Sequence, residues 1–352
     1  MQTPSRPLLQ ALVGDEEVEA FFSDAAELAA MLRTEAALAE AGAGAGLIDT
    51  EAARRIGDAC RAFQPDWERL TEGLARDGVV VPELVKQLRT ATGEVHGKLT
   101  HMGATSQDII DTALILRLKD VLAIVEHRLD ALIASLRGLQ ARDGGTALMA
   151  HTRMQQALPF TAADKIETWI QPLERQRQGL RDLAPRLLVV QLGGPIGTRS
   201  ELKGRGDAVA AAMAEILGLG SAPPWHSQRD RIGEFAAFLS LLSGALGKIG
   251  QDIVLMAQNE VGEVRLATGG GSSAMPHKSN PVPAEVLVAL ARFNAGLLGT
   301  LHQALVHENE RSGAAWTLEW LVLPRMVAST AAGLSKALAL AGSVSFAPAK
   351  AP

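Results

Sequence analysis

Gly269-Gly-Gly-Ser-Ser-Ala-Met-Pro-His-Lys-Ser-Asn-Pro281 is a non-periodic stretch between two long apolar helical patterns. Its three glycines remove the Cβ restrictions on the backbone and predict a hinge. Asn280 is a good N-cap, and Pro281 fits the first position of a following helix, whose N-terminus favours an anion. The stretch is therefore interpreted as a mobile catalytic loop that presents Ser272 and Lys278 to a negatively charged substrate. A flexible glycine-serine linker is the alternative that composition alone leaves open.

Outward from this loop, apolar residues recur with a 3.6-residue period along almost the whole chain, and no convincing alternating strand is found. The sequence predicts an all-α fold: an elongated bundle of long helices with a small N-terminal helical domain. The expected domains are residues 1–105, the bundle at 106–341 and a frayed tail at 342–352. The expected helices are 21–42, 50–60, 82–88, 106–142, 161–183 with an interruption near Pro172, 225–261, 281–308 and 314–340. Their wide apolar stripes favour burial against other subunits, although a monomeric bundle remains possible.

Composition excludes several classes of protein. The 352 residues are 47% hydrophobic and 21% charged, with a net charge of -5, which is ordinary for a globular chain and gives no reason to expect nucleic acid. Cys60 is the single cysteine, so neither an internal disulfide nor a cysteine-rich metal site can form. No signal sequence and no uninterrupted apolar run of about 20 residues is present. The sequence predicts a cytoplasmic protein without membrane or nucleic-acid partners. Because tyrosine is absent, acid-base chemistry must come from Ser, His, Lys or a carboxylate.

Three further polar stretches could carry chemistry: residues 101–108, 151–159 and 224–231. The glycines of 191–197 fit neither a dinucleotide-binding nor a P-loop spacing, so a plain turn is predicted there. His302 and His307 are five residues apart, about 140° around a helix, and cannot ligate one metal from the same face. No metal and no cofactor are expected.

Several of these stretches together resemble the fumarase/aspartase superfamily over nearly the whole chain. They are Gly-Ser-Ser-x-Met-Pro-x-Lys-x-Asn-Pro in the loop, His-x-Gly-Ala-Thr-Ser-Gln-Asp-x-x-Asp-Thr from His101, Pro-Trp-His-x-Gln-Arg-Asp-Arg from Pro224, and Glu-x-Glu-Arg-x-x-x-Ala-Trp-x-x-Glu-Trp from Glu308. Within the superfamily the last three most closely resemble the bacterial 3-carboxy-cis,cis-muconate cycloisomerases, which close a lactone ring.

The resemblance implies a homotetramer in which three subunits build each active site around a small polycarboxylate. It implies Ser272 as the residue that transfers a proton at carbon. Lys278 is a catalytic candidate because a cation stabilises the negative charge that develops on the substrate, and Arg153 is a third on the chemical grounds given below. The residues implied to bind substrate are His101, Thr105, Ser106, Gln107, Thr152, Gln155, His226, Arg229, Asn280 and Arg311.

Each of these residues also has a structural alternative. Ser272 and the polar residues at helix starts can simply be caps, and Trp225 with His226 can staple a helix entry. Arg311 and Glu319 can form a buried structural pair.

Three departures from the family pattern carry consequences. Arg153 follows Thr152 at a position where most lyases of the superfamily have a histidine. Asn309 likewise stands at a position where relatives tend to have a histidine. The family also continues into a small C-terminal helical domain, which is expected to be absent here.

Arg153 favours ring closure on chemical grounds. An amine or alcohol leaving group needs a proton, whereas the leaving group of a lactone is a carboxylate that is stable without one. A permanently charged arginine is then acceptable and could grip a substrate carboxylate in two places. A structural salt bridge is the alternative for Arg153. A fumarate-forming lyase such as adenylosuccinate lyase, or a catalytically silent helical assembly, stays open as the function.

Overall fold

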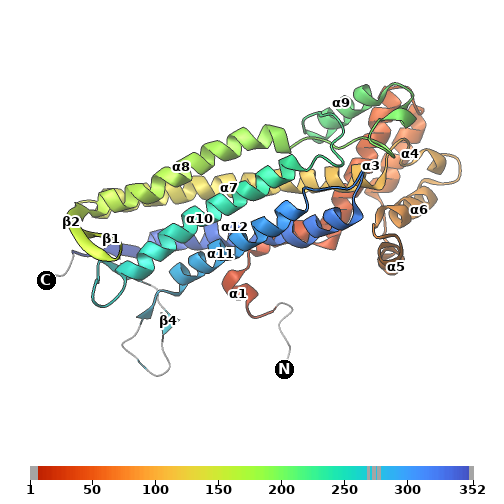
Figure 1. Ribbon diagram of the computed structural model, residues 1–352. Coiled ribbons are helices and arrows are strands. Elements are labelled where there is room, and N and C mark those ends of the chain that lie inside the picture. The colour runs from red at the N-terminus through yellow and green to blue at the C-terminus, as the bar shows by residue number, and fades with distance from the viewer. Residues whose placement is uncertain (1–6, 268–269, 272–274, 276–278, 349–352) are drawn as a thin grey trace.

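The structure is a computed structural model that describes residues 7–267, 270–271, 275 and 279–348. Five long helices run side by side along an elongated body (Figure 1). They are α7 (Ser106–Asp143), α8 (Ala162–Leu187), α10 (Asp230–Met256), α11 (Val282–Gln303) and α12 (Gly313–Ser343). Contacts connect α7 to α8, α8 to α10, α10 to α11, α11 to α12 and α12 back to α7, so the bundle is closed. The predicted mostly helical, elongated bundle is confirmed.

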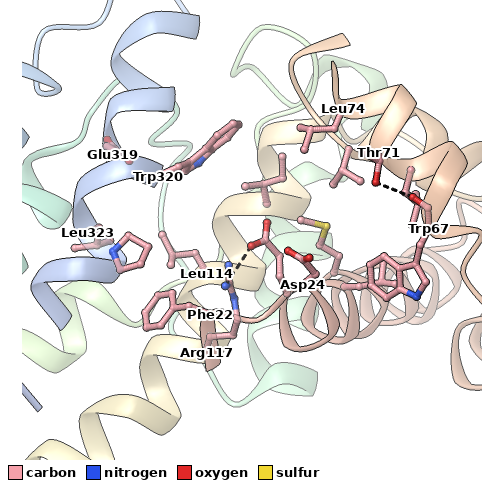
Figure 2. Close-up of a pocket in the computed structure, with 17 residues that line it drawn as sticks. Phe22, Asp24, Trp67, Thr71, Leu74, Leu114, Arg117, Glu319, Trp320 and Leu323 are labelled. Carbon is pink, nitrogen blue, oxygen red and sulfur yellow. Dashed lines mark hydrogen bonds and ion pairs between the residues drawn. The ribbon is translucent and has the colours of Figure 1, made fainter. Parts of the chain in front are cut away.

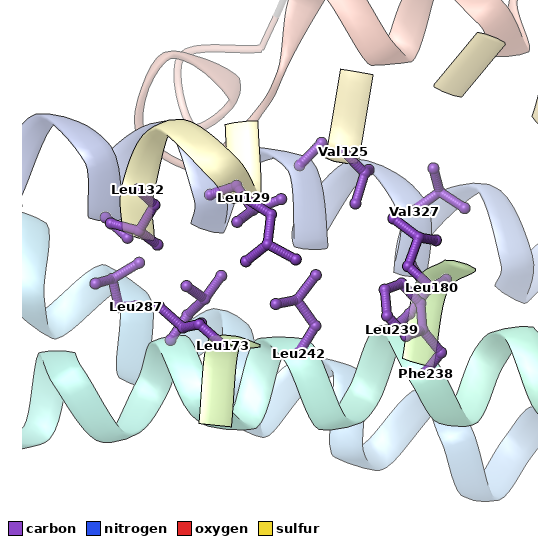
Figure 3. Packing of buried hydrophobic residues seen from close by; sticks show 14 of the residues in the cluster. Val125, Leu129, Leu132, Leu173, Leu180, Phe238, Leu239, Leu242, Leu287 and Val327 are labelled. Atoms are coloured by element: carbon purple, nitrogen blue, oxygen red, sulfur yellow. The ribbon is translucent and has the colours of Figure 1, made fainter. Parts of the chain in front are cut away.

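The core of the bundle is a continuous set of aliphatic and aromatic side chains. Figure 3 shows side chains from all five helices meeting there: Val125, Leu129, Leu132, Leu173, Leu180, Phe238, Leu239, Leu242, Leu287 and Val327. Burying each such side chain is worth roughly 1.5–3 kcal/mol, which outweighs the weak helix propensity of the branched residues. Because α7 has 38 residues, it separates the two ends of the bundle by about 57 Å.

Shorter helices lie at one end of the bundle (Figure 1). They are α3 (Asp24–Gly44), α4 (Thr50–Arg61), α5 (Trp67–Asp77), α6 (Val81–Thr92) and α9 (Gly206–Leu217). Earlier in the chain come α1 (Gln10–Val13), which contacts α11 and α12, α2 (Glu16–Glu19) and the 3-10 turn η1 (Ala20–Phe22). Two further 3-10 turns are η2 (Gly97–Leu99) and η3 (Ser200–Leu202). Side-chain oxygens of Ser23, Asp49 and Asp66 accept hydrogen bonds from the free N-H groups at the starts of α3, α4 and α5.

Short strands correct the expectation that the chain contains none. β1 (Ala147–Thr152) pairs antiparallel with β2 (Gln155–Thr161), β3 (Val264–Leu266) with β6 (Val344–Phe346), and β4 (Gly270–Gly271) with β5 (Ser279–Asn280). The β1–β2 register shifts between Met149 and His151. A bulge of this kind breaks strict alternation, which is why no period of two stands out in the sequence.

The segment expected to fray after residue 342 is partly ordered. β6 pairs with β3, the Phe346 N-H donates to Asp143 Oδ2 at 2.9 Å, and the Phe346 ring lies 6.0 Å from that of Trp169. The backbone N-H of Ala347 donates to the Glu263 carbonyl oxygen at 2.9 Å. These contacts hold β3 and β6 against the C-terminal end of α7.

Three helix boundaries also differ from expectation. α8 continues through Pro172, because the side chains around it, such as Trp169 and Leu173, are buried and fix the helix by packing. α10 begins at Asp230 rather than near Trp225, and α11 begins at Val282, with Pro281 at the N-cap position instead of Asn280.

Two of the long helices are apolar enough to be compared with membrane spans. By length and composition alone, α10 and α11 could each cross a membrane, with a mean hydropathy of 1.4 in their most apolar windows. The window in α10 is 61% buried within the chain, as expected of a core helix, whereas that in α11 is 33% buried. An exposed apolar face therefore runs along α11.

Candidate functional site

Seven of the predicted site residues gather at the bundle end that carries α3 to α6. They are His101, Thr105, Ser106, Gln107, His226, Arg229 and Arg311. Thr105 is the N-cap of α7, and its N-H donates to Asp108 Oδ2 at 2.9 Å. The capping role that the sequence left open is thus present for Thr105, and it fixes the direction in which the whole stretch 101–108 enters the helix.

Asp108 organises this end of the bundle, a role that the motif from His101 does not by itself predict. Its side chain is fully buried and accepts hydrogen bonds from the N-H groups of Thr105, Gly193 and Gly194, at 2.9, 2.7 and 2.9 Å. His226 Nε2 lies 2.7 Å from Asp108 Oδ1. The Thr-x-x-Asp spacing of a capping box was the sequence signal that could have identified it.

His226 is held deep in the structure by this carboxylate. Its side chain is 3% exposed, and its Nδ1 has no hydrogen-bond partner among the described residues. The nitrogen faces the turn 193–197, and a Cβ built on Gly193 would lie 2.6 Å from His226 Cε1. Only glycine allows this close approach, so the turn predicted at 191–197 has a packing function.

His101 forms a second acid-imidazole pair. Its Nδ1 lies 2.6 Å from Oε1 of Glu35, a buried carboxylate on α3. Burial alone lowers the pKa of His101, but the charge and hydrogen bond of Glu35 outweigh it, so that the pKa is raised above its ordinary value. His101 also adopts a left-handed backbone with φ 65°, which costs energy in a residue other than glycine. Glu35 was missed because nothing in the apolar period of α3 marks it.

Gln107 and Arg311 extend the hydrogen bonds around His226. Gln107 donates through Nε2 to the carbonyl oxygen of His226 at 2.9 Å and accepts at Oε1 from Arg311 Nε at 3.0 Å. Arg311 Nη2 also donates to the carbonyl oxygen of Pro195 at 3.1 Å. Arg311 remains partly exposed, so a cation stands at the edge of the histidine pairs.

Arg229, which is predicted to bind substrate, lies in a buried ion-pair cluster. Its guanidinium is fully buried and donates to Asp111 at 2.7 and 3.1 Å and to Glu319 at 2.8 and 2.6 Å. Burial lowers the pKa of Arg229, but the two carboxylates more than reverse this and raise it. Trp316 Nε1 donates to Asp111 at 3.2 Å, and the ring of Trp225 covers the guanidinium at 4.8 Å. Arg229, Asp111 and Glu319 are thus all paired with one another inside the chain.

Glu319 therefore pairs with Arg229 and not with Arg311. Burial raises the pKa of Glu319 in spite of the opposing hydrogen bond and charge of Arg229. The adjacent His307 is also buried, and neither of its ring nitrogens has a hydrogen-bond partner among the described residues.

A second group of predicted site residues, Thr152, Arg153 and Gln155, lies at the opposite end of the bundle (Figure 1). Thr152 pairs with Gln155 in the β1–β2 hairpin, and Arg153 and Met154 form its two-residue turn with φ of 49° and 67°. These residues are exposed, Met154 by 75%. Arg153 makes no ion pair within the described part of the chain, so the salt-bridge alternative finds no support there.

The base of the predicted catalytic loop lies at this same end. Gly270 pairs with Asn280 and Gly271 with Ser279, and a Cβ on Gly270 would come within 2.6 Å of Val282 Cγ2. The glycine hinge is thus a paired stem at Gly270, where close packing excludes any side chain. Ser272 and Lys278 lie outside the described residues.

The two groups cannot meet within one chain, because the length of α7, about 57 Å, separates them. Among the described residues, no group of three or more His, Cys, Asp or Glu side chains is arranged to hold a metal ion.

Comparison with known proteins identifies the family of this chain. Residues 11–293 match a family model described as "Lyase". A 3-carboxy-cis,cis-muconate cycloisomerase of Pseudomonas aeruginosa is 42% identical over 96% of this chain and 75% of its own length. A trans-aconitate decarboxylase of Mycosarcoma maydis is 34% identical over 94% of this chain and 68% of its own.

Comparison with a solved structure shows that the fold is shared as well. The 3-carboxy-cis,cis-muconate lactonizing enzyme of Pseudomonas putida superimposes with a TM-score of 0.91 at 39% identity, covering 97% of this chain and 78% of the other. The chain therefore belongs to the fumarase/aspartase superfamily of lyases.

Proposed function

We propose that the chain is a 3-carboxy-cis,cis-muconate cycloisomerase of the protocatechuate branch of the β-ketoadipate pathway, working in the cytoplasm without a cofactor. Relatives of that name from four bacteria, at 37–42% identity, support the assignment. The observation that carries it is Arg153, which stands exposed at the tip of the hairpin without an ion-pair partner in the described chain. Such an arginine can hold a carboxylate but cannot protonate an amine or alcohol leaving group.

The active site is shared between subunits of a homotetramer. One end of each chain supplies the His101–Gln107 stretch, and the other end supplies the hairpin and the 269–281 loop. An antiparallel neighbour would bring the two ends together. The exposed apolar face of α11, where Phe293 is 46% exposed, provides surface for this association.

The reaction needs one new C–O bond and one proton. A substrate carboxylate oxygen adds to an alkene carbon, and the adjacent carbon, which develops carbanion character next to another carboxylate, accepts a proton from Ser272. Lys278, Asn280 and Arg153 stabilise the negative charge that develops on that carboxylate. Because a carboxylate becomes an ester, the tricarboxylate takes up one proton from solvent for each lactone formed.

Competing activities come from relatives of lower identity. Trans-aconitate decarboxylase and N-acetyl-S-(2-succino)cysteine lyase are the names of proteins 34% and 32% identical to this chain. The first reaction would release carbon dioxide, and the second would give a thiol and an unsaturated acid. An adenylosuccinate lyase-like enzyme would form fumarate, and a silent assembly would do none of these.

The test is a direct assay on the tricarboxylic diene. We expect loss of the diene absorbance, uptake of one proton per turnover in weak buffer, and no effect of a chelator. Ser272→Ala should reduce the rate by about 10²-fold or more, with the oligomer intact. An unchanged diene, with turnover of one of the other acids, would refute the proposal.

Subunit sharing has its own test. His101→Gln and Arg153→Gln disable opposite ends of the chain, so each variant alone should be slow. Unfolding and refolding them together should restore activity, because hybrid oligomers contain sites built only from intact ends. If the mixture stays as slow as its parts, His101 and Arg153 do not act together in a site shared between chains.

A further inference from the structure

A cavity of about 350 Å³ opens between the short helices and the bundle, away from the network around Asp108. Its walls come from α3, α5, α7 and α12 (Figure 2). Met31, Leu70 and Leu323 at its floor are buried, whereas Trp67 and Leu74 near its mouth are each 45% exposed. The volume lies in the range of pockets that enclose small organic ligands. None of the candidate substrate-binding residues lines it.

Aromatic rings stand on opposite sides of this cavity. Trp67 on α5 faces Trp320 on α12 across the space, with Phe22 below (Figure 2). The ring of Trp320 packs against that of Trp316, with the ring centroids 4.7 Å apart. The guanidinium carbon of Arg117 lies 5.6 Å from the centroid of the Phe22 ring. Rings of this kind offer a flat apolar surface and a negative face that attracts cations.

The charges on the wall are mainly negative. Asp24 points toward the cavity (Figure 2) and has no hydrogen-bond or ion-pair partner among the described residues. Glu27 lies 3.4 Å from Arg117, the one basic residue of the lining. The guanidinium of Arg117 also donates hydrogen bonds to the carbonyl oxygens of Phe21 and Ala113, each at 3.3 Å, so its N-H groups are engaged within the chain. Glu319 is held by Arg229 on the other side of α12.

We propose that this cavity binds an organic monocation with an apolar body, such as an aryl-alkylammonium. The ammonium would lie beside Asp24, and the body would fill the space between Trp67 and Trp320. A polycarboxylate is disfavoured, since Asp24 would repel it and the guanidinium of Arg117 is already paired with Glu27. The cavity is therefore a ligand site of opposite charge preference to the candidate active site, and the proposal does not depend on which reaction that site performs.

Binding can be measured with phenethylammonium by tryptophan fluorescence and calorimetry on the full chain. Phenylacetate and 2-phenylethanol have the same ring with a negative or no charge. We expect saturable binding of phenethylammonium and binding at least about tenfold weaker of the other two.

Variants locate the site. Asp24→Asn should weaken phenethylammonium binding by about three- to tenfold. Thr71→Trp, at the partly open wall, should block it. Glu40→Gln removes an exposed carboxylate from the same helix and should change nothing.

Four results would overturn the proposal. They are no saturation below about 10 mM, equal binding of the three compounds, an unchanged affinity in Asp24→Asn, or a change of oligomeric state in Asp24→Asn. The last result would mean that a side chain of another copy fills the cavity. Circular dichroism of each variant confirms that the helices remain folded.

Discussion

Replacing Arg229 by methionine tests whether this residue holds the fold together or binds substrate. The guanidinium makes four hydrogen bonds of 2.6 to 3.1 Å to Asp111 and Glu319, and all three side chains are at most 3% exposed. Methionine fills similar space but leaves both carboxylates without their cation. Removing one partner of a buried ion pair costs about 3–5 kcal/mol, because the remaining charge stays in a poorly solvated position.

A loss of this size is large compared with the total stability of a folded chain, roughly 5–15 kcal/mol. At a urea slope of about 1–3 kcal/mol per molar, the unfolding midpoint should fall by about 1 M or more. The measurement is urea unfolding at fixed protein concentration, followed by circular dichroism. Arg231→Met is the matched control, since Arg231 is only partly buried and donates to a single carbonyl oxygen. It should lose at most about 1.5 kcal/mol.

The same variant has a defined pH dependence. Burial already raises the pKa of Glu319, and loss of Arg229 raises it further. The folded state then binds a proton more tightly than the unfolded state, so stability falls as pH rises through and above the carboxyl range. The deficit of Arg229→Met should accordingly be smaller at pH 5 than at pH 8. Adding Asp111→Asn and Glu319→Gln should recover much of it.

A different result would refute this reasoning. If Arg229→Met unfolds within about 1 kcal/mol of the parent chain while its KM rises strongly, the arginine binds substrate and the buried cluster is not a structural unit. A deficit that grows at low pH would contradict the electrostatic explanation, because protonation relieves an unpaired carboxylate.

Three other predictions follow from single contacts. Glu35→Gln should lower the pKa of His101 by about one unit or more, as followed by NMR titration; the stability that this pair contributes is present at low pH and is lost as pH rises through the raised pKa of the histidine. Gly193→Ala should cost about 1–3 kcal/mol in urea unfolding, because its methyl group would lie 2.6 Å from His226 Cε1. Cys60, whose pKa is raised to about 12 by burial, should react with a thiol reagent at pH 8 only after denaturation.

Matched controls accompany these measurements. Glu40→Gln, on an exposed face of the same helix, should leave the titration of His101 unchanged. Gly179→Ala has no atom within 4 Å of the added Cβ and lies inside a helix, so it should not destabilise the chain. Fast labelling of native Cys60 would show that the segment α4 opens locally.

Much of the bundle could be predicted because its signals are local. The apolar stripe of α7 and the cap at Thr105 depend on residues a few positions apart, and the 3.6-residue period follows from burial of one face. The β1–β2 hairpin could not be predicted in this way. Its two-residue turn, Arg153-Met154, lacks the glycine or asparagine that marks such turns, and a bulge interrupts its alternation.

The candidate site was predicted in its composition but not in its partners. The motifs identified His101, Gln107, His226 and Arg311, which the structure does bring together. They did not show that Glu35 holds His101, because that pair joins residues 66 positions apart. Tertiary packing alone sets such distances.

Sequence by itself determined that the chain folds as long helices, since these follow from short-range periodicity. Local residue chemistry also predicts a loop directed at an anion. Tertiary structure decided that Arg229 lies in a paired cluster between α7 and α12, and that the hairpin and the loop stem stand a bundle length away from His101. The physical reason is that charge pairing and separation depend on where distant segments pack. A rigid helix of about 57 Å keeps the two ends apart.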